Sequence, residues 1–105
     1  MTRERLRNRR RSEIFTLELY GLHYVASFSR FDDGRIAEVF LQDRKPASQS
    51  DANARDSAIA ASLALQYGCP LDVLRRALLR DAHGNASTPL GIALDLIAAA
   101  EEQGG

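Results

Sequence analysis

Two pairs of turn residues, Tyr20-Gly21 and Asp33-Gly34, separate three stretches in which apolar and polar residues alternate. These stretches are residues 13–20, 22–30 and 36–42. A period of two, in segments rich in aromatic and β-branched side chains, is typical of β-strands with one buried face. Asp-Gly is a preferred pair for a two-residue type I′ turn, in which both residues need a positive φ. The segment is therefore predicted to form an antiparallel three-stranded meander.

The two turns independently place the same side chains on one face of the sheet. A two-residue turn at Asp33-Gly34 sets Phe28 opposite Val39, whereas a turn at Tyr20-Gly21 sets Leu17 opposite Tyr24. We predict that the shared face is the core side of the sheet. It carries Phe15, Leu17, Leu19, Leu22, Tyr24, Ala26, Phe28, Val39 and Leu41.

The opposite, outer face of the predicted sheet is also apolar. It would carry Ile14, Val25, Phe40 and Ile36, with Phe31 beside them. Several apolar residues gathered on one outer face exceed the scattered hydrophobic residues of an ordinary surface. We therefore expect this face to meet a partner protein or a second copy of the chain as a homodimer.

The remainder of the chain has the pattern of three helices. Ser50 or Asp51 can cap the first, Cys69-Pro70 begins the second, and Thr88-Pro89 begins the third. Strands followed by helices predict an α+β fold, a three-stranded antiparallel meander with three helices packed on one sheet face. The expected organisation is a basic, flexible arm over residues 1–12, a single domain over 13–102 and a frayed tail over 103–105.

Three segments in this order resemble the TSCPD domain family. They are the hairpin F-x-D-G-R-x-A-E-V-F-L at 31–41, the helix ARDSAIAASLALQYG at 54–68 and the helix CPLDVLRRALLRD at 69–81. The family occurs as the C-terminal module of adenosylcobalamin-dependent ribonucleotide reductases and as small free-standing proteins. The resemblance covers roughly residues 13–98 and implies a TSCPD-like fold and a place near ribonucleotide reduction. Cys69-Pro70 is followed by Leu71 and not by the Asp of the Thr-Ser-Cys-Pro-Asp motif, so no functional residue is carried over.

A single cysteine, Cys69, limits the chemistry that this resemblance implies. A reductase of that class is expected to use a thiyl radical, a redox-active cysteine pair and further thiols that reload the pair. One cysteine cannot supply them, so we expect that the chain is not an enzyme by itself and has no catalytic residue. A lone cysteine before a proline is typical of a small, buried capping residue, and it fits a reducing, cytoplasmic location.

The other polar residues do not form the pattern of a cofactor or metal site. His23 falls opposite Glu18 in the predicted register, which indicates a cross-strand surface pair. His83 lies in a turn with only Asp81 nearby, and the glycines match no phosphate-binding loop. We expect neither cofactor nor metal. Because no apolar run approaches the ~20 residues that span a bilayer, we expect no membrane contact either.

The first predicted helix begins with a polar cluster, Asp51, Arg55 and Asp56. The role of this cluster has two interpretations. The polar cluster could bind a nucleotide or a partner at the helix N-terminus. Alternatively, the acids offset the helix dipole and Arg55 forms a local ion pair. The second interpretation requires no ligand.

Six arginines precede the first strand and are opposed there only by Glu4. They are Arg3, Arg5, Arg7, Arg9, Arg10 and Arg11, whereas residues 12–105 carry eight basic and thirteen acidic side chains. Such an arm would release counterions from a polyanion and bind it without sequence preference. It could also act only as a solubilising tail, because no recognition helix or base-stacking platform follows it.

Two functions follow from these patterns. The first is a non-catalytic accessory, regulatory or protein-interaction module that resembles the TSCPD domain, whose partner could be a ribonucleotide reductase or another protein of nucleotide metabolism. The alternative is a small nucleic-acid-associated protein that binds through the arginine arm. A third hypothesis, an enzyme with an Asp and Arg site at the first helix, has little support.

Overall fold

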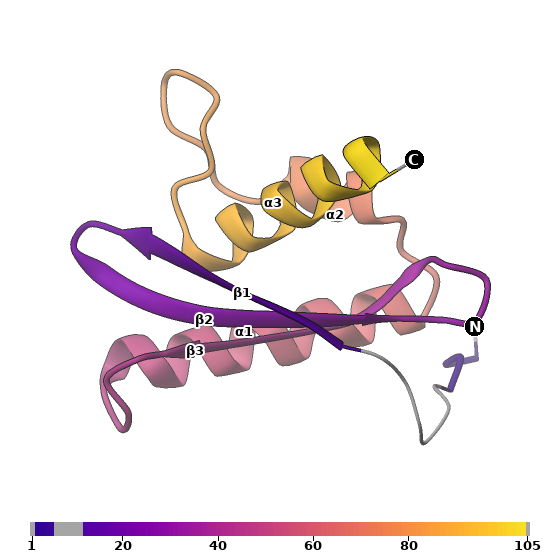
Figure 1. Ribbon diagram of the computed structural model, residues 1–105, viewed down its shortest axis with the longest axis horizontal. Coiled ribbons are helices and arrows are strands. Elements are labelled where there is room, and N and C mark those ends of the chain that lie inside the picture. Colours follow the sequence, from indigo (N-terminus) through magenta and orange to yellow (C-terminus); the bar gives the residue numbers. More distant parts are fainter. Residues whose placement is uncertain (1, 6–11, 105) are drawn as a thin grey trace.

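The computed structural model describes residues 2–5 and 12–104 and confirms the α+β class (Figure 1). Its strands are β1 (Ser12–Leu19), β2 (Leu22–Arg30) and β3 (Ile36–Asp43), and its helices are α1 (Gln49–Gln66), α2 (Leu71–Ala77) and α3 (Pro89–Gly104). The strands form one antiparallel sheet in the order β1-β2-β3. The meander predicted from the turn residues is therefore present.

The first hairpin has the predicted turn and the predicted register. Tyr20 and Gly21 have φ values of 51° and 79°, as a type I′ turn requires. Leu19 consequently lies opposite Leu22, and the pairing continues through Leu17 and Tyr24. A tyrosine at positive φ is strained, so the turn is held by the strand pairing on both sides of it.

The second hairpin keeps the predicted strand register but not the predicted turn. The N–H of Phe31 donates to the carbonyl of Arg35 at 2.8 Å, and only Gly34 in this loop has a positive φ, 95°. The connection is therefore a three-residue loop that ends in a left-handed glycine, and not a two-residue type I′ turn. The Asp33 carboxylate accepts the N–H of Arg35 at 3.0 Å and stabilises this alternative, as aspartates in turns commonly do.

An irregularity in β3 follows from this loop and corrects the outer-face prediction for Ile36. Arg30 pairs with Ile36 whereas Ser29 pairs with Glu38, so β3 contains one extra residue. The extra residue turns Ile36 towards the inner side of the sheet, where it joins the core with 7% of its surface exposed. Phe31 is equally buried, beneath the guanidinium of Arg35. The outer-face prediction was wrong for Ile36, whereas Phe31 is buried but does not belong to the core cluster.

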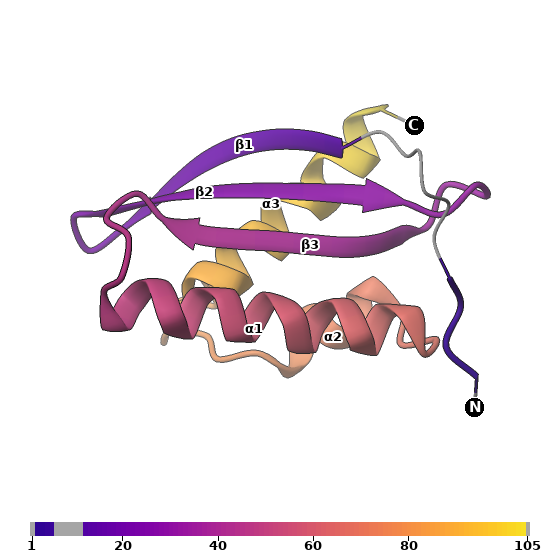
Figure 2. The ribbon, with the colours of Figure 1, turned by 90° about the horizontal axis from the view of Figure 1, so that it is seen from below.

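The core lies between the inner face of the sheet and the helices. α3 crosses this face diagonally, from the end of β3 towards the start of β1 (Figure 2). Its buried side chains meet those of β1, β2 and β3, and the cluster includes Leu17, Tyr24, Ala26, Phe28, Val39, Leu41, Leu90, Ala93, Leu94 and Ile97. All six of these strand residues belong to the predicted core face.

α1 lies along the edge of β3, beside the sheet, and α3 lies over the inner face, whereas α2 lies next to α3 and α1 and not over the sheet (Figures 1 and 2). The contact of α1 with β3 is partly polar, because side chains of the helix hydrogen-bond to the backbone of the edge strand. The Ser62 hydroxyl accepts the N–H of Val39 and donates to its carbonyl, both at 2.9 Å. The Gln66 amide donates to the carbonyl of Ala37 at 3.1 Å. These polar side chains fix the helix at the edge.

The start of α1 is fixed by a buried carboxylate. Ser48 caps the helix by accepting the N–H of Asp51, so the helix begins before the predicted caps, Ser50 and Asp51. The Asp51 side chain instead accepts the N–H of Asp43 at 3.0 Å and joins the helix to the end of β3. Capping at Ser48 leaves Asp51 available for this contact.

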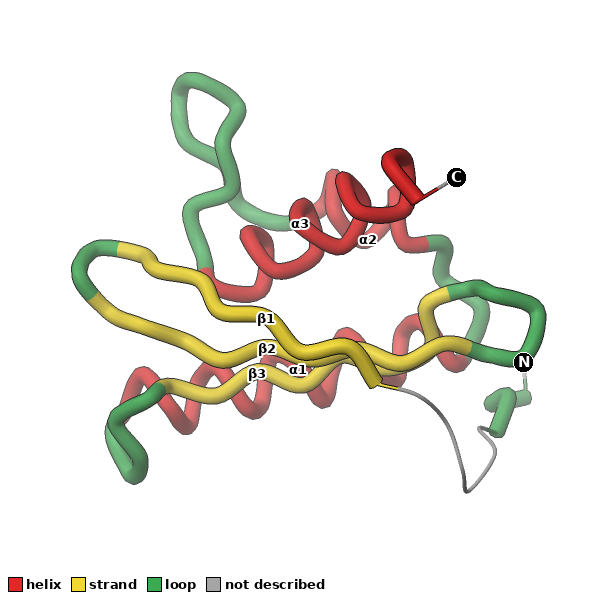
Figure 3. The backbone as a smooth tube through the Cα atoms, viewed as in Figure 1, coloured by secondary structure: helices red, strands yellow, loops and turns green. Residues whose placement is uncertain are grey.

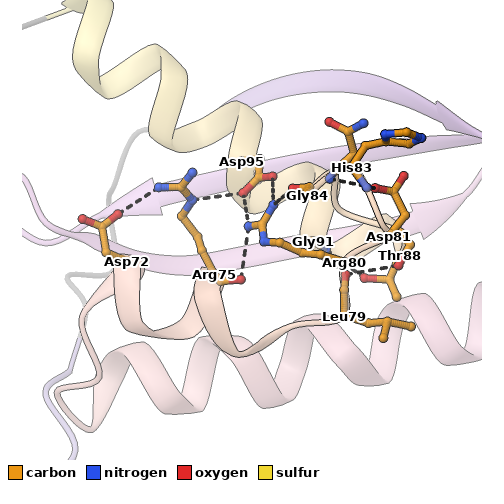
Figure 4. Close-up of polar contacts among 12 residues, drawn as sticks. Asp72, Arg75, Leu79, Arg80, Asp81, His83, Gly84, Thr88, Gly91 and Asp95 are labelled. Atoms are coloured by element: carbon orange, nitrogen blue, oxygen red, sulfur yellow. Dashed lines mark hydrogen bonds and ion pairs between the residues drawn. The ribbon is translucent and has the colours of Figure 1, made fainter.

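An ion-pair cluster joins α2 to α3 (Figure 4). The Arg80 guanidinium contacts both carboxylate oxygens of Asp95, at 2.8 and 2.9 Å, and Arg75 contacts one of them at 3.0 Å. The hydrogen bond from Arg80, assisted by that from Arg75, lowers the pKa of Asp95 although partial burial opposes the shift. Arg80 also donates to the carbonyl of Gly84 and so holds the loop between α2 and α3, which projects from the molecule in Figure 3.

Candidate functional site: an apolar groove on the outer face

A groove of about 630 Å³ runs between the outer face of the sheet and α1. Its apolar lining includes Ile14 from β1, Val25 from β2, Phe40 from β3, and Ile59 and Leu63 from α1. Ile14, Ile59 and Phe40 are 73%, 59% and 50% exposed. We call this surface the outer-face groove. No helix lies across this face of the sheet in Figure 2.

The position of α1 explains why the groove exists. Ser62 and Gln66 attach the helix to the β3 edge, so one flank of α1 faces the core and the neighbouring flank faces the outer side. Small residues such as Ala58 lie where the helix approaches β3 and contribute to the lining. Ile59 and Leu63 extend beyond them and form one wall, while Phe40 belongs to the sheet side. The groove therefore results from packing a small-residue helix face against a strand edge.

Two arginines line the groove near opposite ends of α1. Arg55 donates to Gln42 at 3.1 Å and to Asp51 at 2.9 Å, near the start of the helix. Arg3 donates to the amide oxygen of Gln66 near the end of the helix. Arg55 and Gln66 are eleven positions apart in α1, which corresponds to about 16 Å along the helix axis at 1.5 Å per residue. The groove is thus mostly apolar, carries a guanidinium towards each end, and also has Glu38 in its lining.

Residues 2–5 contact the folded domain at the Arg3 end of the groove. The N–H of Glu4 donates to the carbonyl of Gln66 at 2.8 Å, and its carboxylate pairs with Arg35 at 2.8 Å. The segment thereby connects the end of α1 to the loop between β2 and β3. The beginning of the predicted arm is therefore part of the groove's surroundings.

Three of the four predicted interface residues line the groove, and the fourth does not. Ile14, Val25 and Phe40 lie together in the outer-face groove, whereas Ile36 is in the core. Of the predicted polyanion-binding arginines, Arg3 lines the groove and Arg5 is exposed. The other four, Arg7, Arg9, Arg10 and Arg11, lie outside the described residues.

The polar cluster at the start of α1 has a structural explanation. Burial opposes ionisation of Asp51, but hydrogen bonds from Arg55 and from the N–H of Asp43 outweigh it and lower its pKa. Asp43 behaves similarly, because the Ser50 hydroxyl and the N–H of Lys45 lower its pKa. Asp56 is exposed and is not part of this network as the structure shows it. The contacts account for Asp51 and Arg55 as residues that attach α1 to the sheet.

The histidines and the cysteine lie apart from the groove lining. His23 faces Glu18 across the strands at 3.9 Å, with both side chains largely exposed. His83 occupies the exposed loop that Asp81 organises, and Cys69 is a partly buried free thiol. Within residues 2–5 and 12–104, no three His, Cys, Asp or Glu side chains are grouped as a metal site would need. In the same part of the chain, no helix is both long and apolar enough to cross a bilayer.

Sequence reasoning missed the α1 wall of the groove. Ile59 and Leu63 share a helical spacing with Ala58 and Ser62, so the periodicity alone does not separate exposed from buried positions. The buried positions are instead Ala54, Ala58, Ala61 and Leu65, together with polar Ser62 and Gln66. The available signal in the sequence was the set of alanines beside the large aliphatic residues Ile59 and Leu63. A helix that buries its alanines approaches its neighbour closely, and its large aliphatic residues can then remain exposed.

Comparison with known proteins relates part of this chain to short segments of longer proteins. No protein-family model matches the chain, and no solved structure matches it. The chain is 39% identical over 70 residues to a vitamin B12-dependent ribonucleotide reductase of Agrobacterium fabrum, and 34% identical over 70 residues to that of Bradyrhizobium diazoefficiens. Each match covers 67% of this chain but only 6% of the relative's length. The chain is therefore related to a short segment of vitamin B12-dependent ribonucleotide reductases.

Proposed function

We propose that the chain is a non-catalytic accessory module of the TSCPD type, which docks through the outer-face groove onto a protein of ribonucleotide reduction or nucleotide metabolism. The groove is the observation that carries this proposal, because it exposes Ile14, Phe40 and Ile59 together on one surface. The relationship to a segment of ribonucleotide reductases supports the choice of partner.

The cysteine content supports a non-catalytic role. Cys69 is the sole cysteine of the chain, whereas the reductase chemistry expected from the resemblance needs several thiols. The aligned region is also a small fraction of each reductase. A module of this size would contribute binding or regulation, and the thiols would belong to its partner.

The groove favours a particular kind of partner segment. Its apolar walls would bury an apolar ridge, and Arg3 and Arg55, the second of which is already paired with Asp51, would meet acidic groups towards the two ends. The contact of Arg3 with the Gln66 amide does not neutralise its charge. An amphipathic segment with aliphatic or aromatic residues between two acids fits this arrangement.

A pull-down with one groove variant that introduces a charge tests the proposal. Ile59→Glu introduces a charge at an exposed groove position and keeps a good helix former in α1. Leu79→Glu is the matched control, because Leu79 is also an exposed aliphatic residue and does not line the groove. We expect wild type and Leu79→Glu, but not Ile59→Glu, to retain a ribonucleotide reductase or nucleotide-metabolism enzyme identified by mass spectrometry. Equal retention by all three chains contradicts the proposal.

The alternative function, nucleic-acid binding through the arginine arm, rests on the charge of the six arginines between residues 3 and 11. The same experiment tests it with a further variant. Replacing Arg7, Arg9, Arg10 and Arg11 by Ser leaves the contacts of residues 2–5 in place. Docking through the groove survives this replacement and nuclease treatment. Loss of all bound material under either condition, with binding that weakens steeply as salt increases, would establish the alternative.

A further inference from the structure

The two edges of the sheet differ in how their backbone groups are satisfied. At the β3 edge, Ser62 bonds both backbone groups of Val39, and Asp51 accepts the N–H of Asp43. β1 forms the other edge, and no other described element runs alongside it (Figure 2). One edge is therefore covered by side chains of α1, and the other is open.

The open edge presents a regular row of backbone groups. The two-residue turn makes Leu19 and Leu22 a hydrogen-bonded pair, and the pairs alternate along the strands. The N–H and C=O groups of Ser12, Ile14, Thr16 and Glu18 consequently point away from β2. The same alternation directs the groups of Val39 away from β2, as its bonds to Ser62 confirm. Within residues 2–5 and 12–104, no hydrogen bond is found to the outward groups of β1.

We propose that β1 pairs with β1 of a second copy of the chain, antiparallel about a two-fold axis, and extends the two sheets into one of six strands. The register that pairs all four outward-pointing residues sets Ile14 opposite Thr16 of the partner subunit and Ser12 opposite Glu18 of the partner subunit. Phe15 then faces its own counterpart at the axis. No glutamate lies opposite another glutamate in this register, so the strand is complementary to itself.

Exposed apolar groups on the inner side favour a second copy over an unrelated strand. The tip of the β1–β2 hairpin leaves Leu22 42% exposed, and α3 leaves Leu96 44% exposed. The last turns of α3 lie towards the start of β1, as the pairing of Glu101 with Arg30 shows. Antiparallel pairing sets the start of one β1 beside the end of the other, so each hairpin tip comes next to the partner's α3. The pairing leaves the outer-face groove uncovered and is independent of the proposed docking.

Sedimentation equilibrium from micromolar to millimolar concentration tests the pairing. Thr16→Pro removes an N–H that points out of the sheet, which edge strands tolerate, whereas Thr16→Val keeps that N–H and the branched shape. We expect dimers for wild type and Thr16→Val, and a dissociation constant raised about tenfold or more for Thr16→Pro. A wild-type chain that stays monomeric throughout, or a folded Thr16→Pro that dimerises equally well, overturns the proposal.

Disulfide trapping tests the register without altering the backbone. Ile14→Cys and Thr16→Cys, each combined with Cys69→Ser, are mixed under glutathione disulfide. In the proposed register, residues 14 and 16 lie directly opposite, with Cβ atoms about 5 Å apart, whereas equal positions are diagonal and about 7 Å apart. We expect the mixture to cross-link faster than either variant alone. Cross-linking that is equal in all three samples, or absent from all, overturns the proposal even if Thr16→Pro fails to fold.

Discussion

The Ser62 hydroxyl satisfies both backbone groups of Val39, accepting its N–H and donating to its carbonyl at 2.9 Å each. One helical side chain thus takes the place of a neighbouring strand residue at the β3 edge. The contact is buried, with Ser62 and Val39 8% and 1% exposed. It positions α1 beside the sheet and, as a result, opens the outer-face groove.

Ser62→Ala is expected to lower the free energy of unfolding by about 1–3 kcal/mol, because it leaves a buried N–H and a buried C=O without their partner. Urea denaturation monitored by circular dichroism measures the change. Ser57→Ala removes the same hydroxyl from the same helix, but that hydroxyl bonds only to the Ala54 carbonyl. An equal loss of unfolding free energy in the two variants would show that the contact with Val39 does not contribute specifically to stability.

Ala47→Gly is expected to raise the free energy of unfolding by about 0.5–1 kcal/mol, because Ala47 has a φ of 60° and pays the steric cost of the left-handed region. The same replacement at Ala60, an exposed position within α1, should instead cost about 1 kcal/mol. Thermal and urea unfolding of both variants check the opposite signs. A loss of stability at Ala47 would mean that the loop is not held in this conformation.

The fold is expected to lose stability in acid. The pKa values of Asp43, Asp51 and Asp95 are lowered by their hydrogen bonds in the folded chain. Such groups stabilise the fold above their unfolded pKa of about 4, and this contribution is lost as pH falls through the lower folded value. Urea midpoints measured from pH 7 down to pH 2.5 should show the decline. Asp95→Asn should reduce the slope, and a constant difference from wild type across this range would contradict the assignment.

Arg80→Lys is expected to loosen the loop between α2 and α3. Lysine cannot reproduce the fork that contacts both oxygens of Asp95, and it also loses the bond to the Gly84 carbonyl. Hydrogen exchange at the amides of Asp81 and Ser87, which bond within this loop, should accelerate several-fold. Arg76→Lys, at an exposed position of α2, is the control. Unchanged exchange in Arg80→Lys would show that the loop is held by its backbone alone.

The sequence predicted the sheet well because its turn residues determine the pairing. Tyr20-Gly21 set the β1–β2 register, and Phe28 lies opposite Val39 as the second turn suggested. It did not predict the three-residue loop, since Asp-Gly is compatible with both turn types and the Asp33 side chain decides between them. The resulting extra residue in β3 moved Ile36 from the outer face to the core.

Only the sheet side of the outer-face groove could be predicted from the sequence. Period-two alternation identified Ile14, Val25 and Phe40, because a strand divides its residues between two faces. The helix wall depended on where α1 packs, and that position is set by Ser62 and Gln66 bonding to the backbone of β3. Polar residues on a helix do not reveal in the sequence that they will bond to a strand edge, so the sequence did not identify Ile59 and Leu63 as a wall of the groove.

The helix beside β3 also decides how far this protein can assemble. A sheet with two free edges can add copies at both sides without end, and fibres grow in this way. Here α1 terminates the sheet on one side through Ser62, Gln66 and Asp51, so the described strands leave one edge for strand addition. Once that site is filled by a second copy, neither edge of the pair can accept another, and the assembly is finite.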